Sequence, residues 1–401
     1  MMGEFSGKQS SPIHFGEQGF QVLAKDGGGC ARVGVLRTPH GAFTTPAFIP
    51  VGTQATVKGM SPEELRGLGI QLILCNAYHL HLRPGEKLIK ELGGLHRFMN
   101  WPGPILTDSG GYQVFSLAPL RRITEEGVFF RSHLDGTPLF LGPEDAVRIQ
   151  IDLGVDLAMC LDECIPHNAS RQYAEESTNR TLRWALRCKN SVGENSGGMS
   201  LFGIVQGGLF PELRRRSAQE LVQIGFQGYA IGGLSVGESP AQRVEMVQMA
   251  LESLPENAPR YLMGVGSPED LVKFVSMGVD MFDCVLPTRC ARNGLLFTRR
   301  GKLDIRHAQN ARSELPVEES CGCYTCTHYS RAYLRHLYMS REILAARLNT
   351  LHNLFYYAQL MQELQRAISQ GRLVEYQRDF FRERTSEDTG HSNVKGKEAV
   401  D

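Results

Sequence analysis

One pattern recurs eight times along the chain and limits its possible folds more than any other feature. Each repeat has a short apolar run, then glycine or polar residues, and most repeats continue into a stretch with helical character. The runs are AFIPVG (47–52), LILCNAY (72–78), ILTDSGG (105–111), LAMCLDE (157–163), FGIVQGG (202–208), YAIGGL (229–234), YLMGVG (261–266) and MFDCV (281–285). Runs this short and this rich in Ile, Leu, Val, Met and aromatic residues are typical of strands covered on both faces.

The stretches between the runs have the start and stop residues of helices. PEDAVRIQIDLG ends at Gly154, PELRRRSAQELVQIG at Gly225 and SPEDLVKFVSMG at Gly278, and each begins with Pro or Ser and has acidic residues in its first turn. Such residues favour the first and last turns of a helix. Eight strand-then-helix units predict an α/β fold of the (β/α)8 TIM barrel type. An open doubly wound sheet fits less well, since it usually has fewer strands and a glycine fingerprint that this chain lacks.

The segments outside the eight units complete the predicted organisation. Residues 20–46 alternate and contain the turn signals DGGG and HG, which predict a small antiparallel cap before the barrel. Two helical patterns follow residue 330. The polar ends, residues 1–12 and 384–401, are expected to be disordered, which leaves one catalytic domain over residues 13–383.

Composition excludes some classes of protein and leaves others open. The chain has 401 residues, is 42% hydrophobic, and contains neither a membrane-spanning apolar run nor the residue order of a secretory signal, so we expect a cytoplasmic protein without a membrane partner. Its 43 basic and 43 acidic residues cancel, yet residues 286–312 contain seven Lys and Arg against Asp304 alone. This local basic stretch indicates either an ordinary polar face or a site for an anionic partner.

Polar residues follow several of the predicted strands. Because reacting groups in a (β/α)8 barrel lie where strands end and loops begin, we expect these side chains to meet in one cavity. They are Asp108, Asp162, Gln206, Gly232, Gly233 and Asp283. Any one acid at such a place could instead cap the next helix. Several together favour a functional site, since like charges in one pocket are costly unless separated pKa values serve acid and base roles.

The surroundings of Asp283 favour a nucleophilic role. It lies between Phe282 and Cys284, just before an expected loop at PTR, and an apolar setting would leave its carboxylate poorly solvated. Attack by a carboxylate on a sugar C1 atom, assisted by a second acid such as Asp108, is the logic of retaining glycosidases. Arg289 and Arg292 follow closely and suit a phosphate-rich substrate. The residues alone therefore suggest ribose chemistry on RNA.

The stretch CGCYTC places three cysteines close enough to wrap a tetrahedral metal ion. In a chain whose other cysteines are scattered, such a cluster more often binds metal than forms disulfides. The fourth ligand could be His328, His336 or His352. A closed structural site is favoured over a catalytic one.

The same residues resemble the tRNA-guanine transglycosylases, also called queuine tRNA-ribosyltransferases, from about Phe20 to about Ile368. The motifs that carry the resemblance are FIPVGTQATVKG, NAYHLHLRPG, TDSGGYQVFSL, ITEEG, LDEC, IVQGG, YAIGGLSVGE, YLMGVG, DMFDCVLPTRCARNG, CGCYTC with SRAYLRHL, and LNTLHNL. The resemblance implies a pentosyltransferase of queuosine biosynthesis on a (β/α)8 barrel, with an inserted or C-terminal zinc-binding helical subdomain at about residues 305–355. It would exchange the guanine at the first anticodon position of tRNA for a 7-deazaguanine, through a covalent aspartyl-ribosyl intermediate and without cutting the backbone.

The resemblance also assigns roles to individual residues. Asp283 would be the nucleophile and Asp108 the general acid and base. The base would be bound by Asp108, Asp162, Gln206 and Gly233, between Tyr112 and Met263. RNA would be bound by Gly264, Val265, Gly266, Ser267, Pro268, Glu269 and Asp270, and by Thr288, Arg289, Cys290, Ala291 and Arg292. One structural Zn²⁺ per subunit would be held by Cys321, Cys323, Cys326 and His352, and the subunits would form a homodimer.

Within the family, Cys164 of LDEC and Val236 of LSVGE resemble the bacterial form, which uses 7-aminomethyl-7-deazaguanine. A queuine-utilising form and a non-catalytic RNA-binding partner subunit on the same barrel are the alternatives. The partner subunit is disfavoured because such a subunit would be expected to lose an acid, and a zinc hydrolase because four protein ligands would close the metal site. Cys290 departs from the asparagine common at its place, so we expect altered RNA contacts without lost activity.

Overall fold

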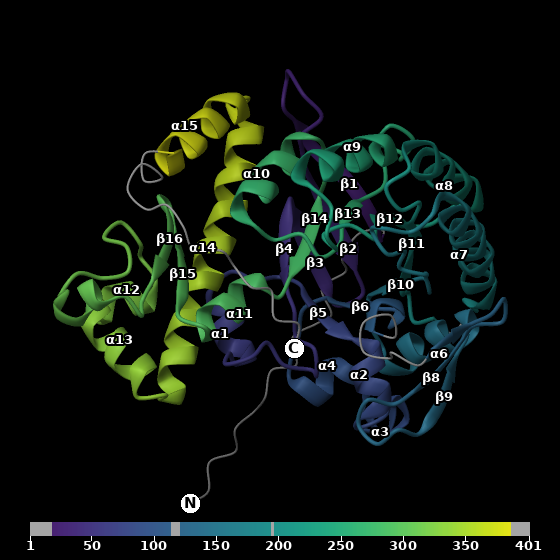
Figure 1. The fold of residues 1–401 in the computed structure, drawn as a ribbon, viewed down its shortest axis with the longest axis horizontal. Coiled ribbons are helices and arrows are strands. Elements are labelled where there is room, and N and C mark those ends of the chain that lie inside the picture. Colours follow the sequence, from purple (N-terminus) through teal and green to yellow (C-terminus); the bar gives the residue numbers. More distant parts are fainter. Residues whose placement is uncertain (1–17, 114–120, 194–195, 386–401) are drawn as a thin grey trace, which may run out of the picture.

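The protein is described from a computed structural model, which covers residues 18–113, 121–193 and 196–385. Eight parallel strands form its centre, in the order β4-β14-β13-β12-β11-β10-β6-β5 (Figure 1). They are β4 (Ala47–Pro50), β5 (Ile73–Asn76), β6 (Ile105–Asp108), β10 (Leu157–Met159), β11 (Ser200–Val205), β12 (Gly228–Ile231), β13 (Arg260–Leu262) and β14 (Met281–Cys284). A parallel bridge between Val51 and Leu74 joins the two end strands. All eight predicted strands are present, so the predicted barrel is confirmed.

Helices surround the strands because each connection crosses back over the outside of the barrel. They are α1 (Pro62–Gly67), α2 (Ala77–Leu82), α3 (Glu86–Glu91), α4 (Gly94–Met99), α6 (Pro143–Leu153), α7 (Arg171–Ser191), α8 (Pro211–Ile224), α9 (Pro240–Leu251), α10 (Pro268–Ser276) and α11 (Leu286–Arg292). Ser267, a predicted start residue, acts as expected, since its side chain accepts a hydrogen bond from the Asp270 N–H. Ser61 and Ser239 begin α1 and α9 in the same way.

The apolar core has two layers, since the strands are covered on both faces. One cluster fills the barrel interior and includes Ile49, Leu106, Met159 and Met281. The larger cluster lies between the strands and the surrounding helices. Polar side chains can therefore reach the barrel's cavity mainly from the strand ends, where the interior packing stops.

The predicted antiparallel cap is present as β1 (Gly19–Lys25), β2 (Arg32–Thr38) and β3 (Gly41–Thr45). It covers the end of the barrel where the strands begin, with Leu36 and Phe43 packed into the interior cluster. Arg32 of β2 forms a buried bidentate ion pair with Asp280, the residue before β14, at 2.9 and 2.6 Å. The cap therefore closes this end of the barrel and leaves the opposite end for a site.

Two parts of the fold differ from the sequence-based expectations. Residues 287–289 were expected in a loop but lie in helix α11. The prediction was wrong because the proline at position 287 occupies the first turn of that helix, where its missing N–H costs nothing. A second antiparallel sheet, β7 (Arg122–Ile123), β8 (Val128–Arg131) and β9 (Pro138–Leu141), was not predicted and lies between β6 and α6.

The C-terminal region lies beside the barrel, on the left in Figure 1. It contains β15 (Leu295–Thr298), β16 (Gly301–Asp304), a 3₁₀ turn (Ala308–Arg312), α12 (Tyr324–His328), α13 (Arg331–Met339), the long α14 (Ile343–Ser369) and α15 (Leu373–Thr385). Helix α14 packs on α11, α10 and β4, so it joins this region to the barrel. Helix α15 continues two residues past the expected domain end at 383. The predictions for residues 1–12 and 386–401 lie outside the described residues, among which no helix could cross a membrane.

Candidate active site and metal centre

Three acids predicted for the site lie at the same end of the barrel. Asp108 is the last residue of β6, Asp283 lies near the end of β14, and Asp162 lies three residues beyond β10. Gln206 follows β11 directly. Since the strands are parallel, their carboxyl ends share one face, opposite the cap. The structure therefore brings these four side chains to the face where barrel sites form.

Asp108 is held by three donors and is nearly buried. Its Oδ1 accepts from the Ala77 N–H at 3.1 Å, and its Oδ2 accepts from the side-chain amides of Asn76 and Gln113, the latter at 2.7 Å. Burial is the largest influence and raises the pKa of Asp108 to about 7; the hydrogen bonds oppose this rise and the charge of Asp283 adds to it. A carboxyl group with a pKa near neutrality can both donate and accept a proton at physiological pH.

Asp283 is held by donors from the neighbouring strand β13 and from the loop that follows it. The Tyr261 hydroxyl donates to its Oδ1 at 2.5 Å, and the Gly264 N–H donates to the same oxygen at 2.9 Å. Burial raises the pKa of Asp283, and these two hydrogen bonds oppose the rise. Both bonds use Oδ1, and among the described residues no other residue donates to Oδ2. One carboxylate oxygen is therefore fixed while the other remains available for reaction.

Asp162 and Gln206 form a second polar pair. The Gln206 side-chain amide donates to Asp162 Oδ2 at 2.7 Å, while Gln206 Oε1 is buried without a partner among the described residues. Burial raises the pKa of Asp162 to about 6. Two glycines give the pair room: a Cβ at Gly111 would lie 2.9 Å from Asp162 Oδ1, and one at Gly233 (φ +64°) would lie 2.3 Å from Gln206 Oε1. A Cβ at position 111 or 233 would clash with this pair, so the packing requires glycine at both positions.

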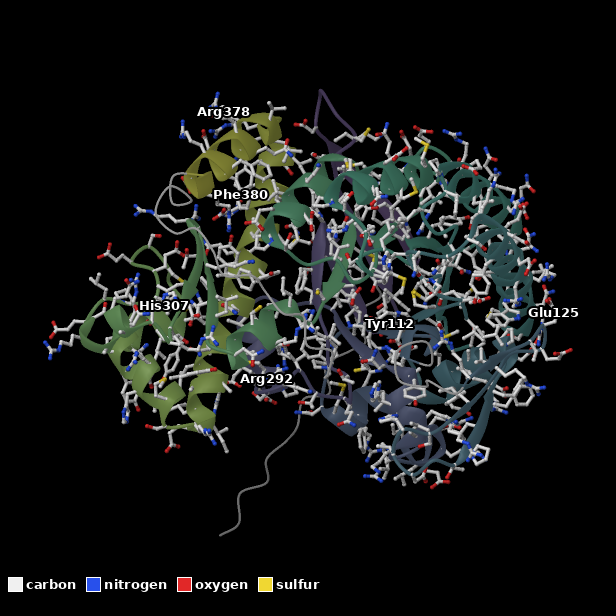
Figure 2. The ribbon with its side chains drawn as sticks, viewed as in Figure 1. Tyr112, Glu125, Arg292, His307, Arg378 and Phe380 are labelled. Carbon is white, nitrogen blue, oxygen red and sulfur yellow. The ribbon has the colours of Figure 1, made fainter. Side chains whose placement is uncertain are left out.

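The other residues expected at the base differ in exposure. Tyr112 is 53% exposed, and Met263 is half-buried against the barrel interior cluster. Burial is the main cause that raises the pKa of Tyr112; the charge of Cys164 adds to the rise and the charge of Arg289 opposes it. In the view of Figure 2, Tyr112 lies over the middle of the barrel and Arg292 lies between it and the C-terminal region.

The segments expected to bind RNA flank Asp283 but are not uniformly accessible. Gly264 and Arg289 are exposed and Arg292 is half-buried, and neither arginine forms an ion pair with a described carboxylate. Two acids of the first segment are already paired, Glu269 with Arg384 and Asp270 with Arg243. The buried members of the two segments are Val265, Gly266, Pro268, Thr288 and Ala291. Contact with a large anion would therefore come mainly from the two arginines and exposed backbone.

Cys290 lies half-buried on α11 and packs partly against the core. Burial raises the pKa of its thiol, and the positive charges of Lys302 and Arg289 oppose that rise. The position predicted to alter RNA contacts thus lies between two cations.

The metal-ligand prediction can be compared directly with the structure. Cys321, Cys323, Cys326 and His352 are all buried, and their ligand atoms lie within 4.8 Å of one another. His352 Nδ1 is 3.3–3.8 Å from the three sulfurs, and its Nε2 lies 2.8 Å from the Phe297 carbonyl oxygen. A tetrahedral zinc ion would separate its nitrogen and sulfur ligands by about 3.6 Å. The donor set therefore fits a closed metal site, with His352 on α14 as the fourth member.

The sequence reasoning missed three polar residues that support the site. Asn76 donates to Asp108, Tyr261 donates to Asp283, and Arg214 of α8 donates to backbone carbonyls in the loops after β11 and β12. Arg214 lies in the run RRR, a pattern that is typical of a solvent-exposed helix face. Ser217, Ala218 and Leu221 follow Arg214 by three, four and seven residues and are buried. This helical spacing indicates that Arg214 lies on the buried face of α8.

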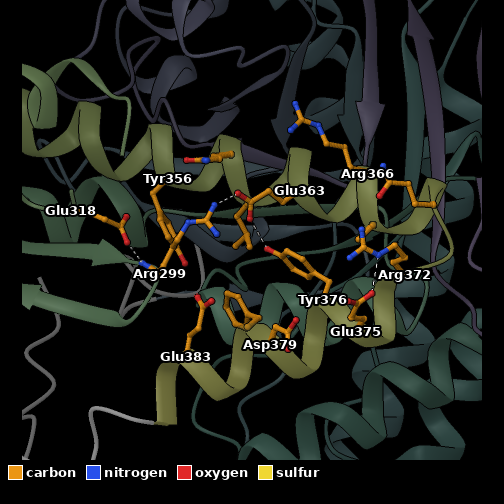
Figure 3. Close-up of a pocket in the computed structure, with 15 residues that line it drawn as sticks. Arg299, Glu318, Tyr356, Glu363, Arg366, Arg372, Glu375, Tyr376, Asp379 and Glu383 are labelled. Carbon is orange, nitrogen blue, oxygen red and sulfur yellow. Dashed lines mark hydrogen bonds and ion pairs between the residues drawn. The ribbon is translucent and has the colours of Figure 1, made fainter. Parts of the chain in front are cut away.

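A separate cavity of about 270 Å³ lies between α14 and α15 (Figure 3). Its charged groups largely satisfy one another: Arg299 pairs with Glu363, the Tyr376 hydroxyl donates to Glu363 at 3.0 Å, and Arg372 pairs with Glu375. It contains none of the strand-end residues, so it is separate from the candidate active site.

Together, the fold and the strand-end acids define a (β/α)8-barrel enzyme with a buried Cys₃His cluster in its C-terminal region that could hold a metal ion. Comparison with known proteins gives the particular family. The sequence profile described as queuine tRNA-ribosyltransferase matches residues 26–386. The chain is 56% identical over 363 residues to the queuine tRNA-ribosyltransferase of Pelotomaculum thermopropionicum, covering 90% of this chain and 98% of that protein. It is 57% identical over 365 residues to the one from Acidithiobacillus ferrooxidans, covering 91% and 97%.

The chain therefore belongs to the queuine tRNA-ribosyltransferase family, the tRNA-guanine transglycosylases, as the resemblance predicted. It is an enzyme of the glycosyltransferase class that acts on tRNA.

Proposed function

We propose that this enzyme exchanges the guanine at the first anticodon position of tRNA for a 7-deazaguanine, through a covalent bond between Asp283 and the ribose. The observation that carries the proposal is the pair of acids at the strand ends. One has a pKa near neutrality, and the other has one free carboxylate oxygen.

The polar pair beyond β10 and β11 matches the edge of a guanine-like base. Asp162 and the unpartnered Gln206 Oε1 are acceptors, and guanine presents N1–H and the 2-amino group side by side. The Gly233 N–H, in the next loop, would donate to the adjacent 6-carbonyl oxygen. Tyr112 and Met263 would contact the two faces of the ring. Such a pocket requires that the base leave its stack in the RNA.

In the proposed reaction the carboxylate of Asp283 attacks C1′ of the ribose, and the bond from C1′ to N9 of guanine breaks. Asp108 gives its proton to the departing base, which leaves Asp108 ionised and the ribose esterified to Asp283. The incoming base then gives its N9 proton to Asp108, and its N9 attacks C1′ to release Asp283. The raised pKa of Asp108 supports both proton transfers.

The nucleic acid would be held beside this pair. Arg289 and Arg292 would contact anticodon phosphates, together with exposed backbone of Gly264–Asp270 and of the helix that contains Thr288, Cys290 and Ala291. Neither arginine is paired with a carboxylate of the described residues, which supports this assignment.

Further parts of the proposal concern the metal, the assembly and the substrate. Cys321, Cys323, Cys326 and His352 would hold one structural Zn²⁺, which would fix α12 against α14. The enzyme would act as a homodimer in the cytoplasm. Its preferred base would be 7-aminomethyl-7-deazaguanine, as Cys164 and Val236 suggest, and comparing the incorporation of this base with that of queuine would test the preference.

The exchange itself can be tested with radiolabelled guanine and unmodified tRNA. We expect label to enter tRNA with the native protein and not with Asp283→Ala. Asp152→Asn is a matched control, since Asp152 lies on α6 and pairs with Lys90 away from the strand ends. Absence of incorporation by the native, zinc-containing protein would contradict the proposal.

A further inference from the structure

Arg214 is a buried cation whose position needs a physical explanation. It is 0% exposed, lies in the first turn of α8, and forms no ion pair with a described carboxylate. Burying a charge is costly, and the first turn of a helix is the end at which a positive charge is disfavoured. Burial lowers the pKa of Arg214 to about 10, so the side chain is still charged at neutral pH.

The guanidinium group instead donates to four backbone carbonyl oxygens. Its Nε bonds to Gly208 O at 2.9 Å, and its Nη1 bonds to Val205 O at 3.1 Å. Two further bonds reach the loop after β12, to Gly232 O at 2.6 Å and to Gly233 O at 3.2 Å. One side chain thus joins the two loops that hold Gln206 and Gly233.

The two bonds to the second loop determine where its N–H groups point. In a trans peptide the N–H of one residue points opposite to the carbonyl of the residue before it. Because Arg214 holds the carbonyls of Gly232 and Gly233 from the α8 side, the N–H groups of Gly233 and Leu234 point away from α8. Neither N–H donates to a protein acceptor within the part of the chain that the structure describes.

We propose that Arg214 is a positioning residue for base specificity, which holds the Gly232 and Gly233 carbonyls so that the Gly233 N–H is aimed at the 6-carbonyl oxygen of the base. This inference rests on the proposed function. Arg214 itself would not touch the base, since the loop lies between them. Discrimination between a base with a 6-carbonyl group and a base without one would therefore depend on Arg214.

The test is to measure how tightly the full-length, zinc-containing protein binds guanine and 6-thioguanine by calorimetry. The thio base keeps N1–H but replaces the oxygen with a weaker acceptor. We expect the native protein to prefer guanine by about fivefold or more, the scale of one lost hydrogen bond. In Arg214→Gln the affinity for guanine should fall more than that for 6-thioguanine, so their ratio should approach one. The KM for tRNA should stay within about twofold, because the RNA contacts lie elsewhere.

Two further variants complete the design. Arg215→Gln is the matched control, because Arg215 is the next residue of α8, is 45% exposed and pairs with Glu252; its ratio should equal the native one. Arg214→Lys retains the charge but cannot reach four carbonyls, so its ratio should lie between those of the native protein and Arg214→Gln. If Arg214→Gln does not fold, as judged by circular dichroism, the ratio of the guanine affinity to the 6-thioguanine affinity in Arg214→Lys tests the inference in its place.

An unchanged ratio in the folded variant, or an equal loss for both bases, would overturn the inference while leaving the proposed function intact. The proposed function would fail separately, if the native protein neither bound guanine nor incorporated it into tRNA.

Discussion

Five acids of the barrel differ in role according to the strand end at which they lie. Asp280 precedes β14 and is held by Arg32, and Asp156 precedes β10 and lies 2.9 Å from both His40 and His96. These two pair with basic side chains at the capped end. Asp108, Asp162 and Asp283 lie at the open end, where their partners are neutral donors. Burial raises the pKa values of the three open-end acids, and their neutral donors oppose this rise only in part, which suits proton transfer. Burial also raises the pKa of Asp280, whose bidentate pair with Arg32 opposes the rise, whereas at Asp156 burial is outweighed by hydrogen bonds from two histidines, which lower the pKa.

The raised pKa of Asp108 predicts how its replacement changes stability with pH. The folded pKa of about 7 exceeds the ordinary value of 3.8, so the folded state binds this proton more tightly. The group's contribution to stability is therefore fully present below about pH 4 and is lost as the pH rises through 7. The melting temperature of Asp108→Asn, relative to the native protein, should rise by about 3 °C or more between pH 5 and pH 8.

Asp135→Asn is the control for this measurement. A hydrogen bond from the Thr137 N–H lowers the pKa of that exposed carboxyl group, so its difference from the native protein should stay flat over the same range. A flat result for Asp108→Asn as well would contradict the assignment of a raised pKa.

Replacing Tyr261 by phenylalanine should change the pH profile of the reaction. Its hydroxyl lowers the pKa of Asp283, so the variant's Asp283 should ionise at higher pH. We expect the acid limb of kcat/KM to move up by about one pH unit or less, the effect of one hydrogen bond. Tyr229→Phe is the control, since Tyr229 is buried on neighbouring β12 but accepts from the Phe226 N–H instead. The same profile in both variants would argue against the role of Tyr261.

At the scale of elements, the strands were predictable and several connections were not. The eight strands are buried on both faces, which forces continuous apolar runs into the sequence. Sheet β7–β9 alternates between buried and exposed residues over four residues at most, too few for a clear period. Helix α11 lacks a side-chain cap at Val285, so the sequence of its first residues is more typical of a turn than of a helix start. Asp108 and Asp283 were predictable because strand ends mark sites, whereas Tyr261 lies within an ordinary apolar strand.

The cap hairpin is joined to the barrel by a clasp of His40, His96 and Asp156. The two rings stack at 3.6 Å and each contacts one carboxylate oxygen. The hydrogen bond with Asp156 raises the pKa of His40, so its contribution to stability is present below about pH 6.5 and is lost as the pH rises through the folded value. The hydrogen bonds from His40 and His96, acting against burial, lower the pKa of Asp156, so its contribution persists down to about pH 4.

We therefore expect His40→Ala to lower the melting temperature more at pH 5.5 than at pH 8.5. His307→Ala is the control: His307 is exposed and lies 3.7 Å from Asp304, whose closer partner is Arg306. Equal losses at both pH values for His40→Ala would show that the clasp does not depend on the charge of the ring.

At the scale of the whole molecule, we expect the stability of the C-terminal region to depend on metal binding at the Cys₃His cluster, and that of the barrel on its own core. The Cys₃His cluster joins α12 to the middle of α14, and α14 packs on the barrel. Binding of a structural metal adds directly to folding free energy. His352→Ala should therefore lose zinc, measured by elemental analysis, and melt at lower temperature. His336→Ala, on α13 and outside the cluster, should retain one zinc per chain.

The most direct test of the account is whether Asp283 forms a bond to tRNA. The native protein, in excess over radiolabelled tRNA and quenched in detergent, should give a protein–RNA band on a denaturing acidic gel. Addition of guanine before the quench should remove the band, and Asp283→Ala should never form it. Incorporation of guanine into tRNA without any such band, or an equal band in Asp283→Ala, would contradict the covalent role of this carboxylate.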